Sequence, residues 1–120
     1  MTVEKIIPML YTREIKETVD FYVQTLGFSS NAYEPGWSWA SLQLDSAEIM
    51  LAIPPKEVPF EKPLFTGSFY FNVDNADEWY ERLKEKAAIY YPIEDFEYSM
   101  REFAIKDCNG YILQFGHELS

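Results

Sequence analysis

The sequence predicts an α+β fold built from two modules, each with the order strand, helix, strand, strand, strand. An apolar run followed by an amphipathic helix occurs twice, and three short strand candidates follow each helix. A constant offset of 61 residues relates the copies and places Glu14 on Asn75 and Leu26 on Ala87. The modules occupy residues 1–53 and 67–120, and because 120 residues are few for two separate cores, we expect a single domain over 1–120.

The first module opens with an apolar run of strand length, Lys5–Tyr11, followed by Thr12, a residue type that caps helices. The predicted helix carries one apolar stripe at helical spacing and ends at Gly27; the stripe consists of Ile15, Val19, Tyr22 and Leu26. Turn residues at 34–36 and 45–46 then separate three strand candidates, which are Phe28–Tyr33, Trp37–Leu44 and Glu48–Ile53.

The second module repeats this order. It begins with the strand Gly67–Val73, and Asn75 with Glu78 forms a capping box that starts a helix. The apolar stripe of this helix comprises Ala76, Trp79 or Tyr80, Leu83 and Ala87. The strands that follow are Ala88–Tyr91, Arg101–Asp107 and Tyr111–His117, the last two joined by a turn at 108–110. Residues 54–66 hold four of the seven prolines, which predicts a stiff extended connector.

The composition excludes several classes of protein. With 48% hydrophobic and 18% aromatic residues the chain must fold, and its net charge of −10 disfavours nucleic acid while attracting cations. One cysteine, Cys108, permits no internal disulfide and indicates a reducing compartment. The apolar run near the N-terminus stops at Pro8, too short for a signal peptide or a membrane span. We therefore expect a cytoplasmic protein without a membrane partner.

Three sets of sequence segments are similar to those of a known protein family. They are Pro8-Met9-Leu10; Thr18-Val19-Asp20-Phe21-Tyr22 with Leu26-Gly27-Phe28; and Arg101-Glu102-Phe103-Ala104-Ile105-Lys106-Asp107 with Asn109-Gly110. With the paired modules, they resemble the glyoxalase/bleomycin-resistance/dioxygenase superfamily, also called vicinal oxygen chelate proteins, and most closely its bleomycin-resistance proteins. The resemblance implies a curved mixed sheet around a cleft and a homodimer that exchanges its N-terminal strand. Pro8 also places the first strand at a sheet edge or module seam, because proline cannot donate to a strand ladder.

The resemblance has two functional branches. The enzymes bind a divalent metal with His, Glu or Gln side chains from the first and last strands of each module, whereas the resistance proteins are metal-free and bind a cationic drug. The resemblance places the ligand positions at Ile7, Met50, Ser68 and Gln114. Isoleucine and methionine cannot ligate such an ion, and the sole histidine, His117, has the opposite strand parity to Gln114. We therefore expect no metal and no cofactor.

The candidate ligand-binding residues are aromatic side chains that could stack on a planar ligand, inward-facing strand residues, and acids of two cation-free stretches that could form a rim. They are Tyr11, Tyr33, Trp37, Trp39, Glu48, Met50, Ser68, Tyr70, Glu94, Glu97 and Gln114. The competing explanations are core packing for the aromatic residues and ordinary solvated surface for the acids. No catalytic residue is predicted, because Cys108 lies in a turn without a nearby base and the chain has no glycine-rich phosphate loop.

The sequence therefore favours a non-catalytic protein that sequesters a cationic, aromatic small molecule and, by the resemblance, confers antibiotic resistance. Its other expected partner is a second copy of itself. The alternative is a glyoxalase-like or dioxygenase-like lyase or isomerase acting on an unknown metabolite. A third possibility is a structural dimer whose cleft is filled by its own aromatic side chains.

Overall fold

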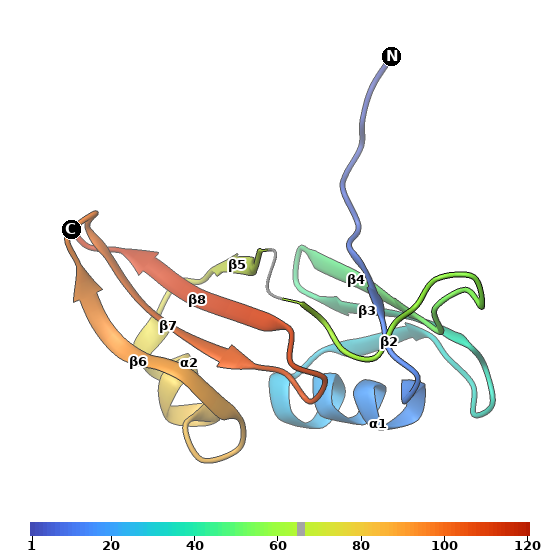
Figure 1. Cartoon of the computed structure of the whole chain (residues 1–120). Coiled ribbons are helices and arrows are strands. Elements are labelled where there is room, and N and C mark those ends of the chain that lie inside the picture. Colours follow the sequence, from blue (N-terminus) through green and yellow to red (C-terminus); the bar gives the residue numbers. More distant parts are fainter. Residues whose placement is uncertain (65–66) are drawn as a thin grey trace. The chain divides into compact units, whose positions relative to one another are not determined.

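The computed structural model describes residues 1–64 and 67–120 and divides the chain into two compact units, Met1–Glu61 and Lys62–Ser120 (Figure 1). Each unit has a four-stranded mixed sheet with helical structure on one face, so the fold is α+β. Both units have the predicted order of elements. Residues 65 and 66, the end of the predicted connector 54–66, lie outside the described residues.

In the first unit, the sheet has the strand order β1-β4-β3-β2. Strand β1 runs parallel to β4, and the other neighbours are antiparallel. The elements are β1 (Met9–Tyr11), α1 (Ile15–Asp20), the π-helix η1 (Phe21–Leu26), β2 (Ser29–Ala32), β3 (Trp39–Leu44) and β4 (Ala47–Ala52). Strand β1 lies at the edge of the sheet, which confirms the prediction made from Pro8.

The second unit repeats this topology with the strand order β5-β8-β7-β6, in which β5 is parallel to β8. The elements are β5 (Phe69–Asn72), α2 (Ala76–Leu83), β6 (Ala88–Phe96), β7 (Met100–Lys106) and β8 (Ile112–Glu118). The N-cap residues of α1 and α2 are Glu14 and Asn75, the pair that the offset of 61 predicts. The internal repeat is therefore present in the structure.

The two helix starts differ in their capping. The Asn75 side chain accepts a hydrogen bond from the Glu78 backbone N–H at 3.2 Å, which confirms the capping box. The prediction that Thr12 is a cap is wrong, because Glu14 is the N-cap and Thr12 instead accepts from the Glu14 N–H at 3.0 Å. In the described residues, none of the helices is long and apolar enough to cross a membrane.

The helix ends also differ from the prediction. The first helix continues as η1, and Gly27 at φ 89° ends it as predicted. Helix α2 stops at Leu83 instead of reaching Ala87, because the N–H groups of Lys86 and Ala87 both donate to the Leu83 carbonyl and close the last turn. The predicted offset therefore holds at the helix starts and fails at the ends.

Several strand boundaries differ from those predicted. Strand β1 begins at Met9 instead of Lys5, and Ile6 is 85% exposed. Strand β3 begins at Trp39, which leaves Trp37 in the preceding loop. Strand β6 continues through Pro92 to Phe96, because an edge strand tolerates a residue without an N–H and the register shifts on both sides of Tyr91.

The connector is less extended than predicted. Its described residues contain no helix or strand, but the Val58 N–H donates to the Pro55 carbonyl at 3.0 Å and closes a turn. The Phe60 ring meets the Tyr11 ring edge to face at 6.0 Å. The described connector up to Glu61 therefore belongs to the first unit.

The side chains of the strands alternate between the two faces of the sheet within each unit. On the face that carries the helix the side chains are buried; this set includes Leu10, Ile49, Leu51, Leu113 and Phe115. The opposite face, called the open face below, carries Met9 at 49% exposure and Tyr70 at 41%. A slip of one residue would exchange the two sets, so the apolar pattern fixes the register.

Candidate functional site

The open face of the second sheet gathers polar and aromatic side chains from all four strands. Tyr70 is paired with Gln114, Gln114 with Ala104, and Ala104 with Tyr91, which forms one row from β5 to β6. Residues paired directly across strands project to the same face. This row places two predicted site residues, Tyr70 and Gln114, beside Tyr91.

A chain of hydrogen bonds crosses this row. The Ser68 hydroxyl donates to Gln114 Oε1 at 2.5 Å, and Gln114 Nε2 donates to the Tyr91 hydroxyl at 2.9 Å. Both ends of the Gln114 amide are therefore occupied by protein partners. Such a chain fixes the side chain's orientation and presents neutral hydrogen-bonding groups to a ligand.

The next row holds a buried carboxylate. Glu102 of β7 is paired with Gly116 of β8 and is 1% exposed. The Tyr98 hydroxyl, from the turn between β6 and β7, donates to Glu102 Oε1. The second oxygen, Oε2, is buried and has no hydrogen-bond partner in the described part of the chain. Together these residues form the tyrosine–carboxylate cluster, defined as Tyr70, Tyr91, Tyr98, Glu102 and Gln114.

Gly116 makes room for this cluster. A Cβ atom at position 116 would overlap the Tyr70 hydroxyl and would lie 2.9 Å from Glu102 Cβ. Contacts under 3.0 Å between such atoms essentially never occur. The Tyr70 phenol therefore occupies the space of the missing side chain, next to Glu102.

The cluster changes the acidity of its tyrosines. Burial, followed by the adjacent Glu102 carboxylate, raises the pKa of Tyr70 above the ordinary phenol value. Burial also raises the pKa of Tyr91, against the opposite effect of its hydrogen bond from Gln114. The hydrogen bond to Glu102 is the main cause that raises the pKa of Tyr98 to about 12. All three phenols therefore stay neutral at physiological pH and can donate hydrogen bonds.

Alkaline titration of tyrosinate absorbance should show Tyr70, Tyr91 and Tyr98 ionising later than ordinary tyrosines. A raised pKa means tighter proton binding in the folded state, so the contribution of Tyr98 to stability is complete below a pH of about 10. It is lost as the pH rises towards its folded pKa of about 12. Glu102→Gln should shift the Tyr98 titration back towards 10, whereas an unchanged titration would contradict the assigned hydrogen bond.

Aromatic rings extend the cluster along the hairpin of β6 and β7. The rings of Phe96 and Tyr98 stack with centroids 5.4 Å apart, and Tyr91 meets Phe96 edge to face at 5.7 Å. Tyr98 is 58% exposed, so the end of this aromatic group is open to solvent. The predicted strand Ala88–Tyr91 is therefore too short, since Phe96 ends β6, and Tyr98 lies in the turn that follows.

The predicted site residues of the first unit lie on or next to its open face. Tyr11 and Trp39 are both paired with Ala52, so they lie on either side of it across the sheet. Met50 lies two residues before Ala52 in β4 and projects to the same face. Glu48 of β4 forms an ion pair with Lys5 at 2.6 Å, so its carboxylate already has a cationic partner. Tyr33 and Trp37 lie outside the strands.

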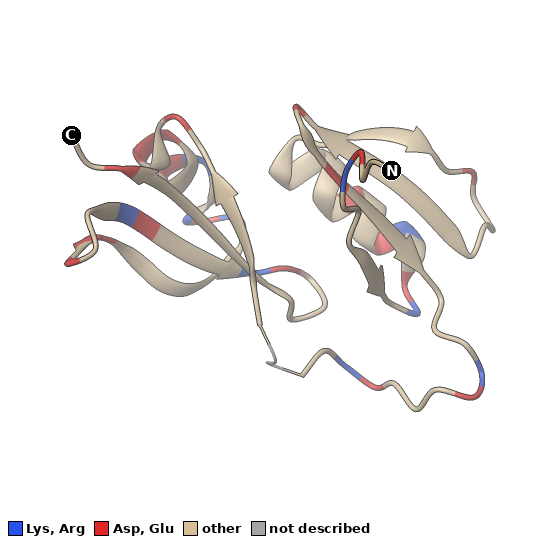
Figure 2. Ribbon diagram, turned by 90° about the horizontal axis from the view of Figure 1, so that it is seen from above, with Lys and Arg blue, Asp and Glu red and all other residues tan. Residues whose placement is uncertain are grey.

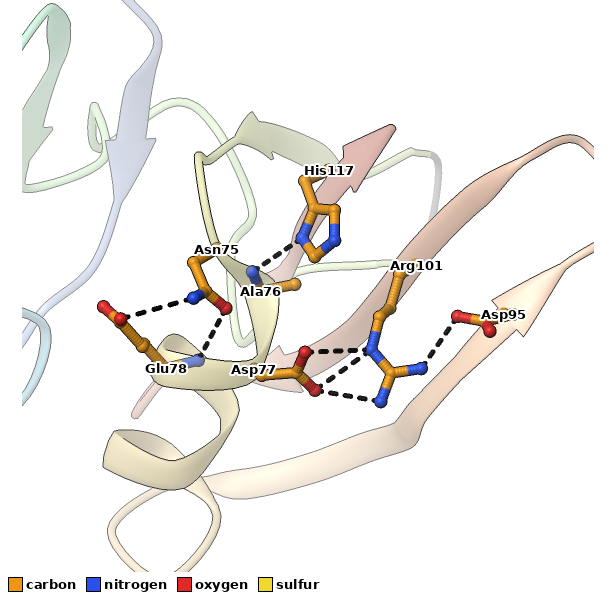
Figure 3. A network of polar contacts seen from close by, with 7 residues as sticks. All are labelled: Asn75, Ala76, Asp77, Glu78, Asp95, Arg101 and His117. Carbon is orange, nitrogen blue, oxygen red and sulfur yellow. Dashed lines mark hydrogen bonds and ion pairs between the residues drawn. The ribbon is translucent and has the colours of Figure 1, made fainter. Parts of the chain in front are cut away.

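The acidic residues are less isolated than the sequence suggests. Basic and acidic segments occur in both units (Figure 2). Arg101 binds Asp95 at 2.7 Å and Asp77 at 2.9 Å, so the expectation that the acids at 94–97 are unopposed is wrong for Asp95 (Figure 3). Glu94 and Glu97 are exposed, at the end of β6 and in the following turn. Arg101 also lowers the pKa of Asp77.

The donors at the predicted metal positions do not fit a divalent ion. Ile7 precedes β1, Met50 offers a thioether, and Ser68 and Gln114 are hydrogen-bonded to each other. His117 faces the helix side, as its parity predicts, because its Nδ1 accepts from the Ala76 N–H at 2.8 Å (Figure 3). In residues 1–64 and 67–120, no group of three His, Cys, Asp or Glu side chains could hold a metal.

Sequence reasoning did not identify Glu102 and Tyr91 as site residues. The predicted strand Arg101–Asp107 corresponds to β7, which lies inside the sheet. In it Glu102 has the opposite parity to the apolar residues Phe103 and Ile105. An acidic residue inside a central strand is a signal of a buried polar group, because such a strand has neighbouring strands on both of its edges. Tyr91 carried no comparable signal, because its position opposite Ala104 depends on a register that shifts on both sides of it.

Two βαβββ units, with an aromatic and hydrogen-bonding site on one sheet, define a paired-module protein of the vicinal oxygen chelate type. The chain belongs to the Glyoxalase/Bleomycin resistance protein/Dioxygenase superfamily, whose family model matches residues 6–115. No curated protein matches the sequence.

Solved structures with similar folds include proteins of different kinds. TioX from Micromonospora sp. ML1 has 20% identity and a TM-score of 0.79 over 98% of this chain and 100% of its own. Lactoylglutathione lyase from Agrobacterium tumefaciens has 18% identity and a TM-score of 0.74 over 98% and 96%. A protein of unknown function from Agrobacterium tumefaciens str. C58 has 16% identity and a TM-score of 0.80 over 99% and 97%. At these identities the likeness concerns the fold alone.

Proposed function

We propose that this protein binds a cationic, aromatic small molecule stoichiometrically, without a metal and without turnover, as a bleomycin-resistance protein sequesters its drug. The observation that carries the proposal is the tyrosine–carboxylate cluster on the open face of the second sheet. It combines three neutral phenols, an amide and a buried carboxylate with an unpartnered oxygen. These groups suit recognition of an organic cation better than activation of water or a metal.

The physical basis is aromatic stacking together with attraction between a cation and the ring faces. Each well-placed contact of this kind contributes about 0.5–2 kcal/mol, so several tyrosines around one ligand can produce specific binding. Phe96 and Tyr98 already stack on each other, which shows that this surface accommodates parallel rings. The exposed Glu94 and Glu97 add a negative field at the hairpin end of the cluster.

The proposal extends to the predicted homodimer. Val3 and Ile6 are exposed apolar residues ahead of β1, and β1 is an edge strand. Pairing of this segment with a second copy would bury these side chains and complete the sheet edge. The first-unit candidates Tyr11, Tyr33, Trp37, Trp39, Glu48 and Met50 are likewise proposed as ligand-binding residues.

Titration with metal-free bleomycin, followed by tryptophan fluorescence, tests the proposed function. We expect saturable, stoichiometric binding that weakens with salt. The double variant Glu94→Lys with Glu97→Lys should weaken binding about threefold to tenfold at low ionic strength, and much less at high ionic strength.

The matched control reverses two acids on the helix side of the same unit. Glu81 lies in α2 and Glu85 lies in the turn after that helix, so Glu81→Lys with Glu85→Lys changes the net charge equally. This control should leave the affinity nearly unchanged. Equal weakening by both pairs would remove the acidic rim from the proposal, and absence of saturable binding would contradict the proposed ligand class.

A further inference from the structure

The carboxylate of Glu102 is the most unusual polar group in the described part of the molecule. It is 1% exposed, and the groups that hydrogen-bond to it are neutral hydroxyls: that of Tyr98 donates to Oε1, and that of Tyr70 also interacts with the carboxylate. Its Oε2 has no hydrogen-bond partner, and no Lys, Arg or His of residues 1–64 and 67–120 forms an ion pair with it. Burying a carboxylate with such incomplete compensation is costly, because water no longer solvates the charge.

The register shows where a compensating group would come from. Glu102 projects to the open face, since it is paired with Gly116, and the helix side of β7 is occupied by Phe103 and Ile105. The phenols of Tyr70 and Tyr98 lie next to its carboxylate on that face. A group that reaches Oε2 from the open face is therefore surrounded by aromatic rings and meets a negative charge.

We propose that Glu102 is the anchor for a protonated amine of the ligand, whose N–H donates to Oε2 while the tyrosine rings contact the cation. This inference rests on the proposed function and narrows the ligand to cations that carry N–H donors, that is, primary or secondary ammonium groups. A quaternary ammonium has the same charge but cannot donate, so it gains only the contacts with the rings.

Tyr98 is the side chain that must move to admit the amine. It is the most exposed member of the cluster at 58%, and it lies in the turn at 97–99, where Ser99 has a φ of 63°. Its hydroxyl occupies Oε1 of Glu102. Outward rotation of Tyr98 uncovers Glu102 at the cost of its stacking on Phe96. Tyr98 therefore acts as a cover that the ligand displaces.

Three probes that share a naphthyl ring separate the contributions of the N–H donor, the positive charge and the ring contacts to binding by the whole chain. They are 2-naphthylmethylamine, 2-naphthylmethanol and the N,N,N-trimethyl derivative of the amine. A hydrogen bond to a charged partner contributes about 1.5–3 kcal/mol, which corresponds to an affinity ratio of about 10- to 100-fold for the amine over the alcohol. We expect the trimethyl derivative to bind more weakly than the amine by a similar factor. Isothermal calorimetry near neutral pH measures all three.

Glu102→Gln should reduce the ratio between amine and alcohol to the small factor that contacts between the cation and the rings contribute, while leaving the affinity for the alcohol unchanged. The matched control is Glu85→Gln, since Glu85 is an exposed acid in the turn that follows α2, outside the proposed binding surface. It should change the ratio less than about threefold, and less still in high salt. Without ligand, Glu102→Gln should raise the melting temperature, because it removes an uncompensated buried charge.

The outcomes distinguish this inference from the proposed function. If the amine and the alcohol bind equally to the natural sequence, the anchor is overturned while aromatic binding stands. If the full preference for the amine persists in Glu102→Gln, Glu102 is not the anchor. If none of the three probes perturbs the ring resonances of the cluster tyrosines in NMR spectra, the proposed binding surface itself is wrong. The comparison on the natural sequence decides the inference even if the variant does not fold.

Discussion

Replacing Phe115 with alanine is expected to lower the free energy of unfolding of the second unit by about 3–5 kcal/mol. Phe115 is fully buried, and its ring lies between three others. The centroids of Phe71, Trp79 and Phe103 are 5.0, 5.2 and 5.3 Å away. The substitution therefore opens a large cavity at the point where β5, α2, β7 and β8 meet. Urea denaturation followed by fluorescence reports it, because Trp79 is the only tryptophan of this unit.

The control for this variant is Phe69→Ala. Phe69 lies in the neighbouring strand β5 and is only partly buried, and the centroid of the Tyr111 ring is 6.5 Å from its own. This substitution should lower the free energy of unfolding by about 1–2 kcal/mol, since Phe69 buries less apolar area on folding than Phe115 does. An equal loss from both variants would contradict the central role assigned to the Phe115 ring. Phe115 also connects the hydrophobic core with the candidate site, because its two neighbours in β8, Gln114 and Gly116, project to the open face.

Replacing Gly116 with alanine is expected to displace the Tyr70 phenol and to lower the free energy of unfolding by about 1–3 kcal/mol. The new methyl group would occupy the position of the Tyr70 hydroxyl and would press on Glu102 Cβ at 2.9 Å. Tyr70 is 41% exposed, so its ring can rotate outward, whereas Glu102 is held within the central strand β7. The pKa of Tyr70 should then fall towards the ordinary phenol value, which alkaline titration measures.

Gly67→Ala is the matched control for this variant. Gly67 precedes β5, and among the described residues no heavy atom lies within 4 Å of the position its Cβ would take. This substitution should change stability by less than about 0.5 kcal/mol and leave the Tyr70 titration unchanged. If Gly116→Ala behaved like Gly67→Ala, the close approach of Tyr70 to the strand would be wrong.

The fold could be predicted largely from local patterns. The alternation of apolar residues in the strands fixed which face carries the helices, and the capping box at Asn75 and Glu78 fixed the start of α2. The edge position of β1 followed from one property of Pro8, its missing N–H. These signals involve neighbouring residues, which is why they can be read without the structure.

The structure differs from the sequence prediction where contacts between residues that are distant in the sequence determine an element's bounds. Strand β6 continues past Pro92 because the shifted register with β7 tolerates it, and no local pattern encodes that register. This pairing forms only after the chain has turned back on itself.

The candidate site was predicted in part. Strand parity correctly placed Tyr70 and Gln114 on one face, together with Ser68 just ahead of β5. Glu102 was missed because an acidic residue in a highly acidic sequence is first interpreted as solvated surface. Only its pairing with Gly116, together with the convergence of Tyr98 on it, shows that it is buried. The binding roles of all these residues remain proposals.

Elemental analysis of protein purified without chelator, alongside a bleomycin titration of the same preparation, tests the proposal that this protein binds its ligand without a metal. The chemistry of Ile7, Met50, Ser68 and Gln114 predicts a substoichiometric content of divalent metal and an affinity that a chelator does not change. A stoichiometric divalent ion whose removal abolishes binding would contradict this proposal and favour a metal-dependent enzyme of the same superfamily.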